Sequence, residues 1–91
     1  MNDFKWRPLD ETKVDYGQVF YMNIANEKPY TVSRLKLMPH SKISYHQHIS
    51  DCEWYINEED GTSEFCPKGE YHSLANDSDE PIFRLSIKKA L

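Results

Sequence analysis

The stretch from residue 45 to residue 76 constrains this chain most, because it holds three histidines and a glutamate that can share one metal ion. His46 and His48 are two residues apart, Glu53 follows five residues later, and His72 lies further along. In a β-strand, residues i and i+2 face the same side with Cα atoms roughly 7 Å apart, so both imidazoles can reach one ion. Imidazole and carboxylate are common ligands of divalent transition metals. The spacing therefore predicts a metal site.

The rest of the chain has the pattern of short β-strands separated by turns. Leu35 and Leu37 alternate with charged residues, as in a half-buried antiparallel strand. Asp60-Gly61 is the strongest local hairpin signal. No window keeps the apolar spacing of a helix, so we expect an all-β sandwich or barrel. The expected strands cover residues 18–24, 30–38, 43–48, 52–56, 63–66, 71–75 and 82–87.

The order of these segments suggests how the predicted ligands meet. We expect residues 43–48 and 52–56 to pair as an antiparallel hairpin across residues 49–51, which carries Glu53 back beside the two histidines. His72 then has to come from a separate strand across the barrel. Ninety-one residues suffice for one hydrophobic core. We interpret residues 1–17 as an irregular N-terminal arm with one short edge strand near residues 4–6, and residues 18–91 as a single barrel domain.

Composition excludes several classes of partner. A net charge of −4 and a sequence pI near 5.5 argue against nucleic acid, which needs clustered cations. No apolar run approaches the roughly 20 residues of a membrane span, and the polar N-terminus does not resemble a signal peptide. A cytoplasmic location is the default expectation. Cys52 and Cys66 are then expected to be small, semi-buried reduced thiols, with Cys52 pointing away from the side that Glu53 faces.

The stretch as a whole resembles the two sequence motifs of the cupin superfamily. His46, His48 and Glu53 match the centre of the first motif, G-x5-H-x-H-x3-4-E-x6-G. The second motif, G-x5-P-x-G-x2-H-x3-N, is matched in full by Gly61, Pro67, Gly69, His72 and Asn76. The resemblance implies a cupin-type double-stranded β-helix, which is a jelly-roll barrel. It also implies that the metal ligands are His46, His48, Glu53 and His72, with Pro67 and Gly69 shaping the turn that delivers His72.

The chain departs from the cupin pattern at two places. His40 stands where the first motif begins with a glycine, at a turn that favours positive φ. In addition, only seven residues separate Glu53 from Gly61, so Gly61 both ends the first motif and begins the second. The hairpin that usually lies between the motifs is almost absent. We therefore expect a shortened barrel that is open on one side, with strand edges covered by a second copy in a homodimer.

The resemblance also narrows the function. It implies a small oxygen-rich substrate and a divalent transition metal from the set manganese, iron, nickel, zinc and copper. Dioxygenases, sugar isomerases or epimerases, and lyases are the enzyme types that it implies, and a non-catalytic small-molecule binding cupin is the alternative. Tyr55 shares the inward face with Glu53, so it either lines the substrate pocket or fills the core. Asn76 either supports a metal ligand or fixes the following turn. Neither Tyr55 nor Asn57 is a good base at neutral pH, so the catalytic residues remain unassigned.

Overall fold

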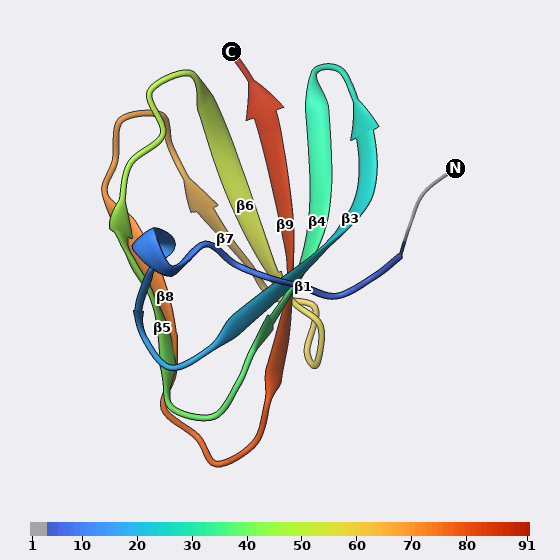
Figure 1. The fold of residues 1–91 in the computed structure, drawn as a ribbon. Coiled ribbons are helices and arrows are strands. Elements are labelled where there is room, and N and C mark those ends of the chain that lie inside the picture. Colours follow the sequence, from blue (N-terminus) through green and yellow to red (C-terminus); the bar gives the residue numbers. More distant parts are fainter. Residues whose placement is uncertain (1–3) are drawn as a thin grey trace.

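The computed structural model describes residues 4–91 and places most of them in two antiparallel β-sheets that face each other (Figure 1). The larger sheet has the strand order β1-β3-β4-β9-β6-β7, and the smaller has the order β2-β5-β8. The expected all-β jelly-roll fold is confirmed. Within residues 4–91, no helix has the length and apolar character needed to cross a membrane. The strands are β1 (Arg7–Pro8), β2 (Val14–Tyr16), β3 (Val19–Glu27), β4 (Tyr30–Leu37), β5 (Ser41–His46), β6 (Asp51–Asn57), β7 (Ser63–Cys66), β8 (His72–Asn76) and β9 (Ile82–Ala90).

The hydrophobic core lies between the sheets at one end of the barrel. Leu35 and Leu37 point inward from β4, as their alternation predicts, and Leu37 is completely buried. Burial of one such leucine contributes about 2 kcal/mol of stability. The cluster also contains Val19, Ile43, Tyr55 and Cys66, drawn from four further strands of both sheets. The core therefore joins the two sheets.

The predicted hairpin between residues 43–48 and 52–56 is wrong. Strand β5 pairs with β2 and β8 in the smaller sheet, whereas β6 pairs with β7 and β9 in the larger one. The two strands therefore face each other across the barrel, and residues 47–50 cross from one sheet to the other. His46 and His72 are Cα partners on neighbouring strands. It is Glu53, not His72, that comes from across the barrel.

The described part of the N-terminal arm contributes a strand to each sheet. Strand β1 pairs with β3 in the larger sheet and β2 pairs with β5 in the smaller, so the expected edge strand begins at Arg7 rather than near residues 4–6. Between them, Glu11–Lys13 forms one 3₁₀ turn that begins at Asp10, whose side chain accepts a hydrogen bond from the Thr12 amide at 3.0 Å. A cavity of about 390 Å³ lies among residues 8–20, and none of the predicted metal ligands lines it.

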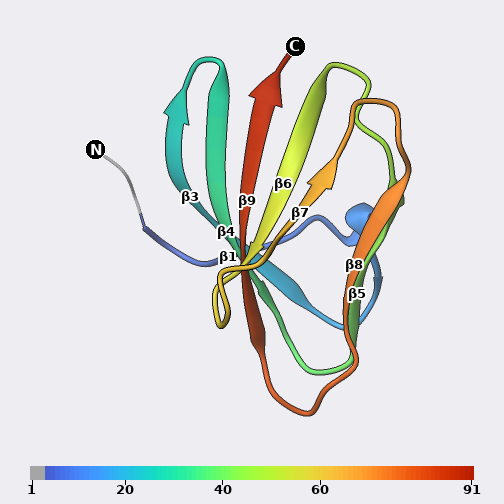
Figure 2. The ribbon, with the colours of Figure 1, turned by 180° about the vertical axis from the view of Figure 1, so that it is seen from behind.

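The barrel is open between β7 and β8, which are each the last strand of their sheet (Figure 2). The predicted Asp60-Gly61 turn is confirmed, since β6 and β7 pair directly and Gly61 has a φ of +74°. This short hairpin takes the place of a longer segment between the motifs, and β7 has only four residues. A cavity of about 130 Å³ lies at this side, between Tyr55 and Arg84 of the larger sheet and Leu74 of the smaller.

His40 adopts the conformation that a glycine usually takes. Its φ is +53°, so the left-handed turn between β4 and β5 is kept although the motif's glycine is missing. The imidazole Nε2 lies 2.8 Å from a carboxylate oxygen of Asp79, and both side chains are exposed. An exposed pair of this kind contributes little stability, so it does not offset the strain of the backbone.

Candidate metal centre

The four predicted ligands converge at one point between the sheets. One ligand atom from each of His46, His48, Glu53 and His72 lies within 4.8 Å of the others. His46 ends β5, His48 lies in the crossing segment that follows, Glu53 lies on β6, and His72 begins β8. Both sheets therefore contribute to the same cluster, and the sequence motifs identified its members.

Glu53 is the centre of the cluster and is 2% exposed. Its Oε1 atom lies 3.0 Å from Nε2 of His48 and 3.1 Å from Nε2 of His72. The hydroxyl group of Ser86 donates a hydrogen bond to Oε2, and the buried Tyr55 side chain lies beside the carboxylate and helps to lower its pKa. Burial raises the pKa of Glu53, but the hydrogen bond from Ser86 and the positive charge of Lys88 outweigh it, and the pKa lies below its usual value. The carboxylate is therefore ionised at neutral pH.

The Nδ1 atom of each histidine faces an oxygen acceptor. In His46 it lies 2.8 Å from the carbonyl oxygen of Ser44, in His72 it lies 3.2 Å from that of Glu70, and in His48 it lies 2.7 Å from a carboxylate oxygen of Asp51. In His46 the carbonyl acceptor at Nδ1 favours the tautomer with the proton on Nδ1, which leaves the lone pair on Nε2. Imidazoles that bind metals are oriented in this way. Nε2 of His72 is hydrogen-bonded to Oε1 of Glu53 at 3.1 Å, and a bound ion would replace this hydrogen bond.

The donor set fits a divalent transition metal. Nε2 of His48 is buried and has no hydrogen-bond partner in the described structure, although Oε1 of Glu53 is only 3.0 Å away. The two atoms are close but lack hydrogen-bond geometry. Their lone pairs are therefore directed at a common point and not at each other. A cation at that point would satisfy both. Burial lowers the pKa of His46 and so favours its neutral form, which is the form that binds a metal.

Hydrogen bonds fix the segment that carries His48. The amide of Gly69 donates to the carbonyl oxygen of His48 at 2.7 Å, and the side-chain amide of Gln47 donates to the carbonyl oxygen of Gly69 at 2.9 Å. Gly69 has a φ of +83°, which a glycine adopts without strain. The turn predicted to deliver His72 therefore also positions His48.

Three residues of the site were not identified from the sequence. Ser86 contacts Glu53, and Asp51 contacts His48. Gln47 links the segment that carries His48 to the turn at Gly69. Alternation along β9 could have indicated Ser86, because it lies on the opposite face to the apolar series in that strand. Asp51 and Gln47 lie at or beside the crossing segment, where no period applies, so no sequence signal could place them.

Tyr55 and Asn76 differ in their relation to the site. Tyr55 is 4% exposed and lies on the core side of Glu53, with its ring centroid 5.8 Å from that of His72. Asn76 is four residues beyond His72 on β8, roughly 13 Å along the strand. Its amide nitrogen donates to three backbone carbonyl groups and its oxygen accepts two hydrogen bonds from Ser78. The structure therefore brings Tyr55 to the site and uses Asn76 to fix turns at the other end of the barrel.

The two cysteines lie on opposite faces of the larger sheet. Cys66 is the Cα partner of Glu53 and faces inward, whereas Cys52 precedes Glu53 and faces outward, as expected. Both are buried and neither forms a disulfide. Burial raises the pKa of Cys66 to about 11, so this thiol is protonated at neutral pH. Cys66 is therefore a core residue beside the site.

Comparison with known proteins identifies the fold. No protein-family model and no curated protein matches the sequence. A predicted oxalate decarboxylase from Thermotoga maritima has a TM-score of 0.84 at 18% identity, over 98% of this chain and 95% of its own. A cupin-2 domain from Rhodospirillum rubrum has a TM-score of 0.79 at 10% identity, over 96% and 70%. A cupin-superfamily sugar phosphate isomerase from Silicibacter pomeroyi has 0.68 at 15% identity, over 80% and 60%. The chain has the cupin fold, and the resemblance seen in the motifs is confirmed at that level.

Proposed function

We propose that this chain is a metal-binding cupin that acts on a small oxygen-rich molecule. One observation carries the proposal: His46, His48, Glu53 and His72 converge within 4.8 Å, and each imidazole faces an acceptor with its other nitrogen. Manganese, iron, nickel, zinc and copper are all compatible with three imidazoles and a carboxylate. A divalent ion held by these four residues would act as a Lewis acid toward an oxygen atom of the substrate.

The protein residues define what the site contributes to a reaction. Burial raises the pKa of Tyr55 far above its usual value, so its hydroxyl group holds its proton beside Glu53 on the core side of the site. Asp51 is engaged by His48. No further carboxylate or imidazole of residues 4–91 belongs to the cluster. Dioxygenase, isomerase or lyase chemistry that relies on the ion itself fits this arrangement better than proton transfer by a separate protein base.

The shortage of a base also supports a second candidate, a cupin that binds a small molecule without turnover. The two candidates share the same metal site and differ in the fate of the bound molecule. They are separated by the products recovered after incubation of the metal-loaded protein with a panel of small hydroxy acids, keto acids and sugar phosphates. New products support the enzyme, and binding without conversion supports the carrier.

We further propose that the protein is a cytoplasmic homodimer. Three apolar residues of β9 face away from the core: Phe83, Leu85 and Ile87 are Cα partners of Lys36, Arg34 and Val32 on the outer face of the larger sheet. Trp54 and Phe65 extend this face, with ring centroids 5.0 Å apart, and Phe65 is 53% exposed. A second copy packed on this face would remove it from water. Light scattering after size-exclusion chromatography tests this, and a monomer at micromolar concentration contradicts it. The free thiols suit a reducing compartment.

The metal proposal is tested by elemental analysis of protein purified without added metal. We expect about one transition-metal ion per chain, and loss of that ion in a His46→Ala/His72→Ala variant. His40→Ala is the matched control, because His40 lies in an exposed turn outside the cluster. Absence of metal from the parent protein, also after addition of each candidate ion, would contradict the proposal.

A further inference from the structure

The inner surface of the barrel is divided at the metal site. On one side lies the hydrophobic core with Leu35, Leu37 and Val19. On the other side the inward positions of the larger sheet are polar. Their inward orientation follows from the register, because Cα partners on neighbouring strands share a face. These positions are Asn23 of β3, Thr31 and Ser33 of β4, and Ser86 and Lys88 of β9.

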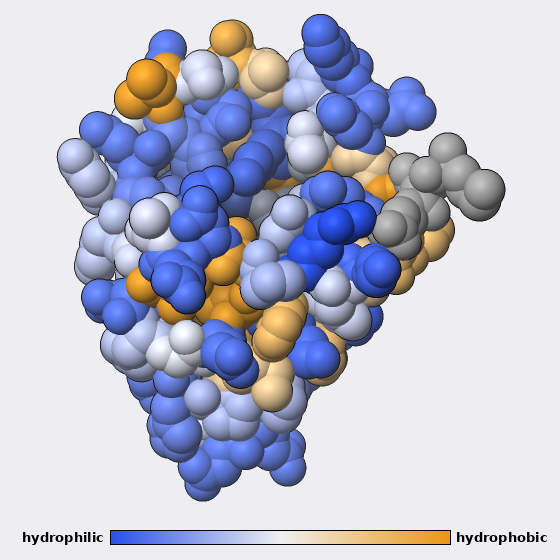
Figure 3. Space-filling view, viewed as in Figure 1, coloured by the Kyte–Doolittle hydropathy of each residue, from blue (hydrophilic) through white to orange (hydrophobic). Residues whose placement is uncertain are grey.

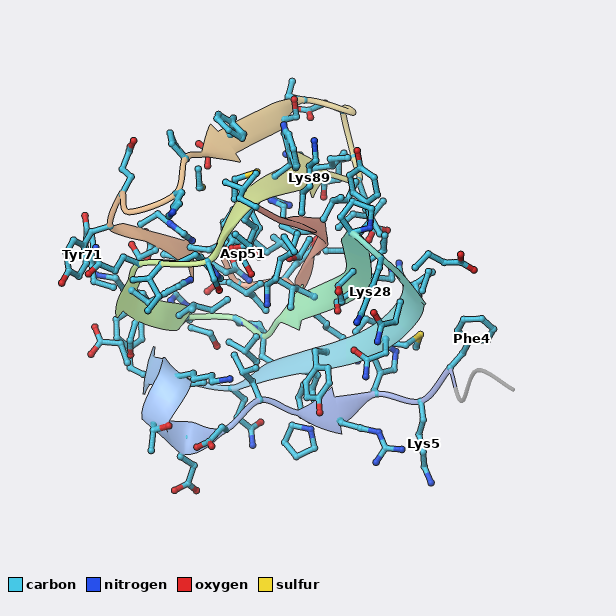
Figure 4. All side chains as sticks on the ribbon, turned by 90° about the horizontal axis from the view of Figure 1, so that it is seen from above. Phe4, Lys5, Lys28, Asp51, Tyr71 and Lys89 are labelled. Atoms are coloured by element: carbon cyan, nitrogen blue, oxygen red, sulfur yellow. The ribbon has the colours of Figure 1, made fainter. Side chains whose placement is uncertain are left out.

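This polar half is the upper end of the barrel in Figure 1. Seen from above, Asp51 lies among the side chains between the two sheets, while Tyr71 projects at the periphery (Figure 4). The surface at the upper end of the molecule is largely hydrophilic (Figure 3). Asn23 is exposed and accepts a hydrogen bond from the Ser33 hydroxyl group. A ligand that reaches the metal site from this end therefore passes a wall of hydroxyl, amide and ammonium groups.

Lys88 is the cation in this wall. It is the Cα partner of Glu53 on the neighbouring strand, so its side chain projects to the same face as the carboxylate. Its charge is close enough to contribute to the lowered pKa of Glu53. Even so, no ion pair within 4.0 Å joins Lys88 to a carboxylate in residues 4–91. Lys88 is half-buried on the same inner face of the larger sheet as Glu53.

A metal ion changes the charge balance around Lys88. The carboxylates of Glu53 and Asp51 would face the ion and His48, and Asp51 lies 2.7 Å from Nδ1 of His48. The divalent ion and the Lys88 ammonium together carry more positive charge than these two carboxylates balance, so an excess of positive charge remains. A half-buried cation without a counter-charge favours an anionic partner. One ammonium group supplies one positive charge without the fixed fork of donors that arginine offers, and a single carboxylate matches that charge.

Resting on the proposed metal-binding function, we propose that Lys88 anchors a carboxylate group of the small molecule that occupies the metal site. The substrate class is then a small organic acid, with one oxygen group placed at the metal and a second, anionic group placed at Lys88. In this arrangement Lys88 determines specificity and does not take part in bond making or breaking.

Lys89 provides a matched control. It follows Lys88 on the same strand and therefore faces outward, where its ammonium lies 5.9 Å from the ring centroid of Tyr30. Lys88→Gln and Lys89→Gln change the net charge of the protein equally. A general electrostatic effect on anion binding would appear in both variants, whereas anchoring by Lys88 would appear in one.

The experiment measures binding to Co²⁺-loaded protein by the visible absorption of the ion. Malonate, with two carboxylates, is compared with malonamate, in which a neutral amide replaces one of them. We expect the parent protein and Lys89→Gln to prefer malonate about tenfold or more, and Lys88→Gln to lose that preference. Lys88→Arg should keep most of it, because the charge is retained. Co²⁺ affinity should be unchanged or higher in Lys88→Gln, because a positive charge has been removed.

The outcomes separate this inference from the proposed function. Failure of the parent protein to bind Co²⁺ would contradict the metal site and with it the anchoring role. If both proteins bind the metal and Lys88→Gln prefers malonate as strongly as the parent, the role of Lys88 is overturned while the metal site stands. A parent protein that binds the metal but does not prefer malonate has the same consequence. Loss of Co²⁺ from Lys88→Gln would show that Lys88 supports the metal site structurally, and would also overturn it.

Discussion

His46 and His72 are directly opposed on the neighbouring strands β5 and β8, with their ring centroids 4.2 Å apart. The register between these strands shifts between Ile43 and His46, which marks an irregularity in the pairing just before the first ligand. Two imidazoles therefore come from one sheet, and the carboxylate of Glu53 comes from the other. An ion held by all three would join the two sheets, so we expect metal binding and the stability of the barrel to be coupled.

Ser86→Ala should weaken metal binding. The Ser86 hydroxyl group donates to the Glu53 carboxylate, and its removal leaves a buried charge with one hydrogen bond fewer. We expect metal affinity to fall about 10–100-fold, as for other residues that orient metal ligands. Calorimetric titration with a divalent metal measures this. Ser33→Ala is the control, because Ser33 is the Cα partner of Ser86 but bonds to exposed Asn23. Equal affinities in both variants would contradict the role of Ser86.

Asn76→Ala should destabilise the protein without changing metal affinity. The amide of Asn76 connects the carbonyl groups of Leu37, Met38 and Glu80, and its loss leaves buried acceptors without a donor. We expect a loss of about 3 kcal/mol in the free energy of unfolding. Urea denaturation of the metal-free protein measures it. A fall in metal affinity comparable to that of Ser86→Ala would instead support the alternative role, in which Asn76 supports a ligand.

Residue patterns predicted the ligands but not the way in which the strands connect them. The residue types and the spacing of His46, His48, Glu53 and His72 can be read directly from the sequence. A hairpin and a crossing between sheets leave the same alternation on β5 and β6, and the choice depends on which pairing buries Leu37 and Ile43 best. The outward direction of Phe83, Leu85 and Ile87 in β9 could not be predicted for a similar reason. Alternation shows that two faces differ, but the face that meets the core is decided by the neighbouring strands.

Gly17→Ala should destabilise the arm strongly. Gly17 has a φ of +76°, and a Cβ atom added there would lie 2.5 Å from the carbonyl oxygen of His40 and 2.6 Å from Cα of Ser41. Backbone atoms cannot move aside easily, so we expect a loss of about 3 kcal/mol or more. Gly61→Ala is the matched control, with a φ of +74° and no atom within 4 Å of the added Cβ. It should cost only about 1 kcal/mol. Thermal and urea denaturation of both variants compare them, and equal losses would contradict the close packing at Gly17.

His40→Gly should stabilise the protein slightly. The left-handed φ of +53° at His40 is strained for a residue with a Cβ atom, and glycine removes that strain. The greater freedom of glycine in the unfolded chain offsets part of the gain, so we expect a net increase of about 0.5–1 kcal/mol. Asp79→Asn, which removes only the charge of the exposed partner, should leave stability nearly unchanged. A destabilised His40→Gly variant alongside a neutral Asp79→Asn variant would contradict the strain.

The metal-free protein should lose stability as the pH falls below about 6.5. Burial holds the pKa of His46 below its usual value of 6.5 in the folded protein, so the unfolded chain binds more protons in this range. The contribution of His46 is therefore fully present above pH 6.5 and is lost as the pH falls through the lowered pKa. Glu53, whose pKa lies below its usual value of 4.5, adds a second loss at lower pH, in the same direction. Urea denaturation between pH 7.5 and pH 5 measures the slope, and His46→Gln should reduce it in the upper part of that range. An unchanged slope in His46→Gln would show that another group binds the protons.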